Sequence, residues 1–320
     1  MLRARYLVAR LAQSAVLLLL LSALIFAILH AIPGGPLRAI LGEAAGADPA
    51  AVQRAEELLG FQQPPLERYV TWLAGVARGD LGASWTVATG RPVGPLLLDA
   101  LGNTLLLTGS ALALAVASGM VLGACSALRR GSRLDVLLGL ASFVLNGAPT
   151  FWLGLLLIVI FAVELGWLPA GGAQTIGRGD PLDRARYLAL PVITLAVVQI
   201  APWGRYVRAS LLEVLGREYI RTAAAKGLAT RTVLFGHALP NAATPLITLL
   251  ALDVPALIGG ATVTEAVFSY PGLGRLLLTS LRAHDWPIVQ GIALVLAASV
   301  ILANLVAEVA IALLNPRLRS

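Results

Sequence analysis

The chain is poor in the side chains that soluble proteins expose and that metal sites use. Charged residues make up 13% of its 320 residues, whereas soluble domains carry about 25%. Cys125 is the one cysteine, which excludes an internal disulfide and a metal site built from cysteines. The three histidines, His30, His237 and His284, are scattered along the chain, so no metal site is expected from them.

What the chain has instead is long apolar runs, since 58% of its residues are hydrophobic. A transmembrane helix needs about 20 mainly apolar residues. Six stretches meet this requirement: 10–31, 101–125, 136–163, 187–208, 246–268 and 288–314. The first stretch is longer than the apolar core of a signal peptide, and we expect it to be retained. The sequence therefore predicts an all-α integral membrane protein of about six transmembrane helices.

The longest polar stretch, residues 32–100, separates the first two predicted spans. It includes two short amphipathic segments, at 50–59 and 66–77. The predicted organisation has two regions. Residues 1–100 hold the first transmembrane helix and an extracytoplasmic segment, and residues 101–320 form a five-helix core. A long loop at 209–245 interrupts this core between the fourth and fifth spans.

Arginine placement predicts the orientation in the membrane. Most basic residues outside 32–100 lie on the side shared by both termini and the 209–245 loop. Cytoplasmic loops carry an excess of Lys and Arg, and long loops cross largely regardless of charge. We therefore expect both termini and the 209–245 loop to be cytoplasmic, with 32–100 facing outward.

The 209–245 loop is the most informative segment for function. Residues 211–226 are rich in good helix formers, and Gly227 can supply the left-handed residue that ends a helix. Thr230 can cap a second short helix, which would stop near Pro240. The pattern predicts two helices that meet at a glycine and form a compact cytoplasmic knob.

Two features of this knob indicate a protein contact. Gly216, Ala223 and Gly227 fall near one face at helical spacing, where small residues let another backbone approach closely. Arg217 and Arg221 lie four residues apart beside them. The alternative is a solvated connector whose basic residues serve only to orient the protein in the membrane.

The loop resembles the cytoplasmic signature of permeases in binding-protein-dependent ABC importers, written E-A-A, three residues, Gly, nine residues, I-x-L-P. Ala223, Gly227, Leu239 and Pro240 match it at the right spacing. The sequences Arg-Thr-Ala-Ala-Ala-Lys-Gly-Leu at 221–228 and His-Ala-Leu-Pro-Asn-Ala at 237–242 resemble its dipeptide, oligopeptide and nickel branch. Weaker fragments in the expected order extend the resemblance over nearly the whole chain, including Arg-Gly-Asp-Leu-Gly at 78–82 and Tyr-Pro-Gly-Leu-Gly-Arg at 270–275.

The resemblance implies a type I importer permease whose loop docks on a separate ATPase subunit. It assigns this ATPase-coupling role to Arg217, Arg221, Ala223, Ala224, Lys226, Gly227, Leu228, His237, Leu239 and Pro240. The implied partners are a second related permease, two ATPase subunits or domains, an extracytoplasmic substrate-binding protein and membrane lipid, with no nucleic acid. The chain has no phosphate-binding G-x-x-x-x-G-K-[ST] loop. We therefore expect no enzyme activity and no bound cofactor, with ATP and Mg on the partner ATPases.

Two acidic residues in the fifth predicted span are candidates for the transport pathway. Charges inside a membrane cost about 2.5–3.5 kcal/mol on insertion scales and are often functional. Asp253 and Glu265 meet this description. The alternative for each is a structural contact with a neighbouring helix.

A peptide is the first-choice substrate that the resemblance implies, with nickel or a metallophore complex as the alternative. A stand-alone secondary transporter is the alternative from another class, but it leaves the 209–245 knob unexplained. An intramembrane hydrolase is excluded, because the spans contain neither H-E-x-x-H nor paired aspartates.

Overall fold

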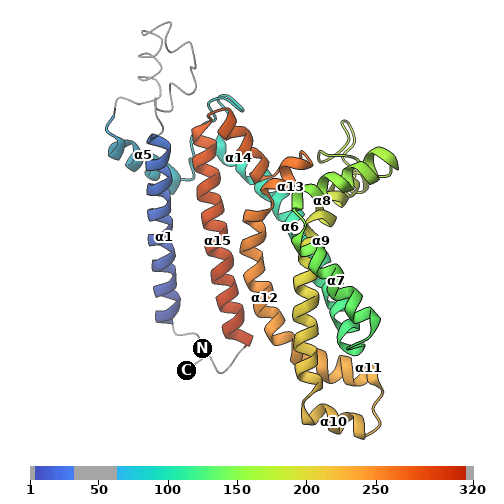
Figure 1. The fold of residues 1–320 in the computed structure, drawn as a ribbon. Helices are drawn as coiled ribbons and strands as arrows, with labels where there is room; N and C mark the ends of the chain where they lie inside the picture. The colour runs from blue at the N-terminus through green and yellow to red at the C-terminus, as the bar shows by residue number, and fades with distance from the viewer. Residues whose placement is uncertain (1–3, 32–62, 315–320) are drawn as a thin grey trace. The chain divides into compact units, whose positions relative to one another are not determined.

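The computed structural model of the chain describes residues 4–31 and 63–314, and these residues are almost entirely helical. The one β-type contact among them is an isolated bridge between Ala83 and Pro92. The all-α prediction is thus confirmed for the described residues. The amphipathic segment predicted at 50–59 lies outside them, whereas the one at 66–77 forms α5 (Figure 1).

The helices follow one another with these bounds: α1 Ala4–His30, α5 Pro65–Ala77, α6 Val93–Leu128, α7 Arg133–Gly147, α8 Thr150–Leu157, η1 Ile158–Glu164, α9 Pro181–Leu215, α10 Glu218–Ala225, α11 Thr230–Val233, η2 Leu234–Ala238, α12 Leu239–Gly260, α13 Thr262–Val267, α14 Leu273–Arg282 and α15 Trp286–Leu314. The stretches η1 and η2 are π-helical.

Four helices of the described chain are each long and apolar enough to cross a membrane, namely α1, α6, α9 and α15. The pair formed by α7 and α8–η1 would be a fifth if it acts as one span. The fifth stretch predicted from the sequence, 246–268, corresponds to α12 and α13, which are separated at Ala261. All six predicted stretches are therefore helical, but they are not six straight spans.

The third predicted span, 136–163, is wrong as a continuous helix. The chain turns by 102° between α7 and α8. Pro149 has no backbone N–H and keeps the preceding residue out of the α region. Ala148 accordingly has φ −77° and ψ 131°, an extended conformation. Pro191 and Pro202, by contrast, lie inside the continuous 35-residue helix α9, as membrane helices allow.

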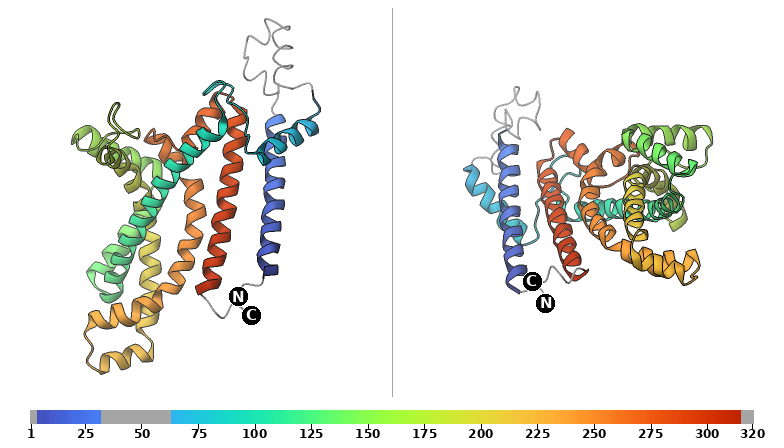
Figure 2. Two further views of the ribbon diagram at one scale, coloured as in Figure 1. Left: turned by 180° about the vertical axis from the view of Figure 1, so that it is seen from behind. Right: turned by 60° about the horizontal axis from the view of Figure 1, so that its bottom comes forward.

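The chain forms two compact units. The first consists of 1–104 and 271–302, and the second of 105–270 and 303–320, so their boundaries fall inside α6 and α15. Within the second unit α7 lies along α9, which Figures 1 and 2 both show. The core of this unit is centred on α9, whose Trp203, Val207 and Leu211 are at most 2% exposed.

Glycines allow α6 and α9 to pack closely in the second unit. A Cβ added at Gly119 would lie 2.5 Å from the Cβ of Trp203, and one added at Gly123 would lie 2.6 Å from the carbonyl oxygen of Gly204. Gly119 and Gly123 are four residues apart, the spacing with which small residues bring membrane helices together. This contact fixes the position of α9, which leads into the 209–245 loop.

We predict that Gly123→Ala destabilises the protein by about 1–3 kcal/mol, the usual cost of forcing an extra carbon into a packed core. The new methyl group would meet a backbone carbonyl, which cannot rotate away. Gly109→Ala on the same helix is the matched control, because a Cβ there meets nothing within 4 Å. Thermal unfolding of the purified variants in detergent measures the difference, and equal midpoints would contradict the close packing.

In the first unit, Asp285 joins the start of α15 to the segment before α6. Its Oδ2 accepts hydrogen bonds from Ser84 Oγ at 2.6 Å and from the backbone N–H groups of Thr86 and Val87 at 2.9 Å each. Asp285 is fully buried. Burial alone would raise the pKa of Asp285, but these hydrogen bonds outweigh it and hold the pKa below its usual value.

Since the pKa of Asp285 is lower in the folded protein than in the unfolded chain, its stabilising effect is present above the unfolded pKa of about 3.9. That effect is lost as the pH falls through the folded pKa. We predict that Asp285→Asn lowers the free energy of unfolding at pH 7 by about 1.5–3 kcal/mol, the range for a hydrogen-bonded charge. It should also remove part of the acid-induced loss of stability. Asp80→Asn, at an exposed position of the same unit, should change neither property in a pH series of unfolding curves.

Candidate functional site

The connection between α9 and α12 forms a compact two-helix loop. Helix α9 ends at Leu215, α10 runs from Glu218 to Ala225, and α11 with η2 leads back into α12. In Figures 1 and 2 this loop lies beyond one end of α9. Gly227 stands between the two short helices with φ +79°, the left-handed conformation that glycine adopts without strain. The predicted pair of helices meeting at Gly227 is therefore present.

The inner face of this loop belongs to the core of the second unit. Ile220 and Ala223 of α10 are buried, as are Val233 and Leu234 on the returning segment. They are part of the same hydrophobic cluster as Leu211 at the end of α9. The loop is therefore packed against α9 and α12.

Ala223 lies on this inner face, 9% exposed. Its side chain is thus covered by the chain itself, whereas the sequence pattern placed it on a face open to a partner. Gly227 lies on the open side, because a Cβ added there would meet nothing within 4 Å. Gly216 and Gly227 are exposed, whereas Ala223 is buried. The three residues therefore do not form one open contact face. Ala224 belongs to α10 as expected.

The outer face of the loop exposes large apolar side chains, most of which were not predicted from the sequence. Phe235 on η2 is 66% exposed, Tyr219 is 42% exposed and Leu228 is 40% exposed. Of these, only Leu228 was among the predicted residues. Hydropathy could not have found Phe235, because the helical period is altered in the π-helical stretch. We refer to these three exposed side chains and Gly227 together as the apolar face of the loop.

The basic residues of the loop are exposed and form only local ion pairs. Arg217 Nη2 lies 2.8 Å from Glu213 Oε1, and Arg221 Nη1 lies 3.2 Å from Glu218 Oε1. The hydrogen bond to Glu213 raises the pKa of Arg217 above its usual value. Lys226, next to Gly227, is exposed as well. These charges are on the surface of the loop and remain accessible to a partner.

The remaining predicted loop residues lie where the loop joins α12. His237 is on η2, and its backbone carbonyl accepts a hydrogen bond of 2.7 Å from Asn241 Nδ2. Leu239 packs partly against the core of the second unit. Pro240 lies in the first turn of α12, where a missing N–H costs nothing. Pro240 is exposed and His237 is partly exposed, and the coupling role of these three residues stays a prediction.

The two acidic pathway candidates lie on separate helices of the second unit. Asp253 on α12 accepts a hydrogen bond of 2.9 Å from Nε1 of Trp203 on α9. Glu265 on α13 has no exposed surface. Asp253 therefore links α9 to α12, and Glu265 is inaccessible to a substrate in this conformation. Their role in transport stays a prediction.

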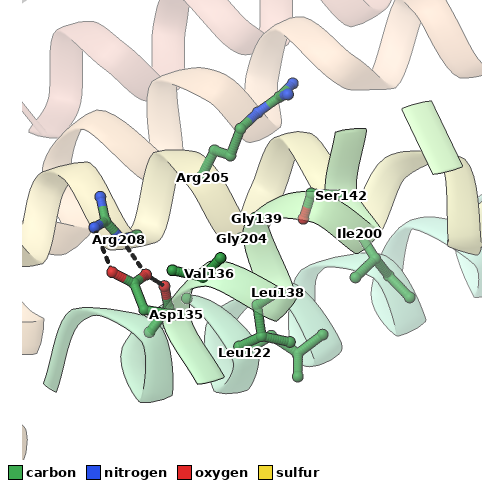
Figure 3. Close-up of a pocket in the computed structure, with 12 residues that line it drawn as sticks. Leu122, Asp135, Val136, Leu138, Gly139, Ser142, Ile200, Gly204, Arg205 and Arg208 are labelled. Carbon is green, nitrogen blue, oxygen red and sulfur yellow. Dashed lines mark hydrogen bonds and ion pairs between the residues drawn. The ribbon is translucent and has the colours of Figure 1, made fainter. Parts of the chain in front are cut away.

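A further charge pair, which is only partly buried, was missed from the sequence. Nε and Nη2 of Arg208 on α9 donate to the two carboxylate oxygens of Asp135 on α7, each at 2.8 Å. Ser126 Oγ of α6 and the backbone N–H of Gly131 also donate to Asp135. The pair lines a cavity of about 300 Å³ between α6, α7 and α9 (Figure 3). It ties three helices together near the end of α9 that leads into the loop.

These features define a class: an integral membrane protein of packed apolar helices with one protruding loop whose outer face is open to a partner protein. The comparison with known sequences then gives the family. The chain belongs to the binding-protein-dependent transport system inner membrane components. The model of that family matches residues 119–320, and the model of its N-terminal region matches residues 1–93. The resemblance read from the sequence is confirmed.

Several transport permeases are similar to the chain over nearly their whole length. The oligopeptide transport system permease protein AppB of Bacillus subtilis is 37% identical, with 98% of this chain and 99% of that protein covered. The di/tripeptide permease DppB of Pseudomonas aeruginosa is 36% identical, with 92% and 93% covered. The glutathione permease GsiC of Escherichia coli K12 is 36% identical, with 98% of each chain covered.

A solved structure supports the fold. The inward-facing MetNI methionine ABC transporter has a chain that matches with a TM-score of 0.57 at 18% identity, covering 69% of this chain and 96% of that one. The protein is therefore a multi-pass membrane permease with the type I importer fold.

The left-handed glycine of the loop gives a direct test of the site's geometry. We predict that Gly227→Ala destabilises the loop by about 1–2 kcal/mol, because a Cβ is strained in the left-handed conformation. Gly227→Asn should cost less, since Asn tolerates this region better. Gly236→Ala is the control, with open space around its Cβ but no left-handed backbone. Hydrogen exchange of α10 and α11 measures the effect, and equal exchange in all variants would contradict the assignment.

Proposed function

We propose that this chain is a permease subunit of an ATP-driven importer and that it forms, with a second permease, the membrane pathway for di- or oligopeptides. The observation that carries the proposal is the two-sided loop between α9 and α12. Its inner face is buried against the helices that would move, and its outer face offers Gly227 and exposed apolar side chains.

The partners follow from this arrangement and from the family. Two ATPase subunits would receive the apolar face of the loop, with ATP and Mg held on those subunits, because this chain has no phosphate-binding loop. The chain would itself hydrolyse nothing. An extracytoplasmic binding protein would deliver the peptide. The basic residues near the termini and the loop support an orientation with both on the cytoplasmic side.

Motion of the ATPases would act on the pathway through the core of the second unit. A displacement of α10 moves Ile220 and Ala223, which are packed with Leu211 of α9. Packed helices shift as rigid bodies rather than deform. The hydrogen bond from Trp203 to Asp253 would then carry the shift of α9 to α12. Alternation between inward- and outward-open states is the usual logic of transporters.

The substrate class is supported by the relatives named above, which transport oligopeptides, di- and tripeptides, or glutathione. Among the residues that the structure describes, no three His, Cys, Asp or Glu side chains gather as metal ligands would. This favours a peptide over a bare nickel ion as cargo. A nickel or metallophore complex remains the alternative, since a chelate brings its own ligands.

The test is substrate-dependent ATPase activity. The chain would be co-expressed with its partner subunits and reconstituted in liposomes, with and without binding protein and peptide. Gly227→Ala and Gly227→Trp share the backbone strain, but only Trp fills the open space that a partner would enter. We predict that peptide-loaded binding protein stimulates the wild-type complex, that Gly227→Ala keeps much of this stimulation, and that Gly227→Trp abolishes it.

Phe235→Ala should weaken assembly with the ATPase, whereas Leu66→Ala, which removes an apolar side chain of similar exposure from α5, should not. A chelate of nickel in place of the peptide tests the alternative cargo. If the chain assembles with no ATPase and Gly227→Trp changes nothing, the proposal is wrong and a stand-alone transporter becomes the better interpretation.

A further inference from the structure

The cavity between α6, α7 and α9 has no role in the proposed transport mechanism. Its volume is about 300 Å³, and all the residues that line it belong to the second unit. Four apolar side chains, contributed by all three helices, form part of its wall: Leu122, Val136, Leu138 and Ile200. Asp135, Arg205 and Arg208 line it as well (Figure 3). The cavity therefore combines an apolar wall with charged side chains.

Asp135, the one carboxylate among the residues that line this cavity, is already paired. Its two carboxylate oxygens accept hydrogen bonds from Nε and Nη2 of Arg208, each at 2.8 Å. Ser126 and the backbone N–H of Gly131 donate to it as well. The negative charge of Asp135 is thus balanced by Arg208, and it leaves no counter-charge for a further arginine.

Arg205 is that further arginine. It is exposed, and its side chain forms neither a hydrogen bond nor an ion pair with any residue that the structure describes. In Figure 3 its guanidinium group extends away from the pair of Arg208 and Asp135. Since an α-helix rises about 1.5 Å per residue, Arg205 lies about 4.5 Å farther than Arg208 from the end of α9 that leads into the loop.

Three more arginines lie at the same end of the cavity, on the connection from α6 to α7 and at the start of α7: Arg129, Arg130 and Arg133. All three are exposed, and within the described part of the chain their side chains form no hydrogen bond or ion pair. The hydrogen bond from Gly131 to Asp135 places this connection beside the cavity. We call Arg129, Arg130, Arg133 and Arg205 the arginine cluster. Its charge indicates an anionic occupant.

The position of the arginine cluster along the helices identifies the source of the anion. The apolar span of α6 ends at Leu128, one residue before the cluster begins. Phospholipid headgroups lie at the ends of membrane spans, and basic pockets between transmembrane helices bind anionic headgroups. Long arginine side chains near helix ends reach this level from within the span.

The apolar surface beside the cluster also fits a lipid. No residue of α7 is buried. Val136, which lines the cavity, is 56% exposed, and Phe143 on the same helix is 77% exposed. An acyl chain can therefore lie in the cavity and continue along α7. A free anion would gain nothing from this apolar surface.

We propose that the cavity and the arginine cluster bind an anionic phospholipid. Arg205 donates to the phosphate, and the other three arginines attract the negative headgroup. One acyl chain packs between α7 and α9, against Val136 and Ile200. The lipid thus fills a gap that the helices leave beside the pair of Asp135 and Arg208. The proposal depends neither on the transported substrate nor on the ATPase partners.

Lipid binding by the full-length chain, purified in detergent and stripped of lipid, tests this proposal. Dioleoylphosphatidylglycerol, which is anionic, and dioleoylphosphatidylcholine, which has no net charge, are added in separate titrations, and bound lipid is counted by native mass spectrometry. We expect phosphatidylglycerol to bind at lower concentrations than phosphatidylcholine. Arg205→Gln should need about fivefold more phosphatidylglycerol, the effect expected for one arginine near an anionic lipid.

Arg231→Gln is the matched control for charge. Arg231 is an exposed arginine of α11 in the same unit and does not line the cavity, so this variant should bind phosphatidylglycerol as the wild type does. Arginines that served only to orient the protein in the membrane would give no difference between Arg205→Gln and Arg231→Gln.

Gly139→Leu tests the apolar part of the site without a change of charge. Gly139 lines the cavity, and a Cβ added there meets nothing within 4 Å. A leucine would occupy the space of the acyl chain and weaken binding. Gly147→Leu, at an equally open position of α7 outside the cavity, should not. A lipid-free unfolding midpoint equal to that of the wild type shows that a variant is folded, and Gly139→Leu remains decisive if Arg205→Gln does not fold.

Five results would overturn the proposal. Equal affinity for phosphatidylcholine would show that only the acyl chains bind, and displacement of the lipid by equimolar glycerol phosphate would identify a free-anion site. Equal weakening by Arg231→Gln would reduce the effect to net charge. Unchanged binding in both Arg205→Gln and Gly139→Leu would place the lipid elsewhere. Loss of the lipid on assembly with the second permease would assign this surface to that subunit.

Discussion

The structure depends on one constraint: inside a membrane, each backbone N–H and C=O must find its partner within the protein, because lipid offers none. The chain meets this constraint with long helices. Most interruptions of the helical hydrogen-bond pattern occur where other groups can pair with the freed backbone N–H and C=O groups. The 102° turn at Ala148 occurs where Pro149 has no N–H to lose. The two prolines inside α9 are accommodated in a helix whose inner face is fully packed. Charged side chains follow a similar rule, since Arg208 of α9 donates two hydrogen bonds to Asp135 of α7.

This rigidity gives the loop between α9 and α12 its significance. A helix that is tightly packed cannot absorb a displacement by bending locally, so a movement at its end is transmitted along it. The glycines of α6 pack closely against α9, which leaves little room for the two helices to move relative to each other. The hydrogen bond from Trp203 to Asp253 joins α9 to α12. In the proposed mechanism the loop is the place where the ATPases act, because its inner face is core and its outer face is open. Asp253 is then a mechanical link between helices.

The sequence predicted the positions of the apolar helical stretches because apolar length is a local property. It also predicted the loop, since Gly227 and its flanking helix formers act locally. It did not predict the turn at Ala148, because hydropathy averages over a window that hides one extended residue. The pairing of Asp135 with Arg208, 73 residues away, is a tertiary contact that no local pattern encodes. The face of Ala223 was assigned wrongly, because periodicity identifies a stripe of small residues but not whether it turns toward the core or away from it.

The central claim is that the loop contacts an ATPase subunit, and the one lysine of the chain allows a direct measurement. Lys226 is exposed beside Gly227, so an amine-reactive cross-linker has one side-chain target in this protein. In membranes containing the co-expressed partners, we predict a covalent adduct between this chain and an ATPase subunit, mapped to Lys226 and absent in Lys226→Arg. The absence of any adduct at Lys226 in an intact complex would contradict this claim.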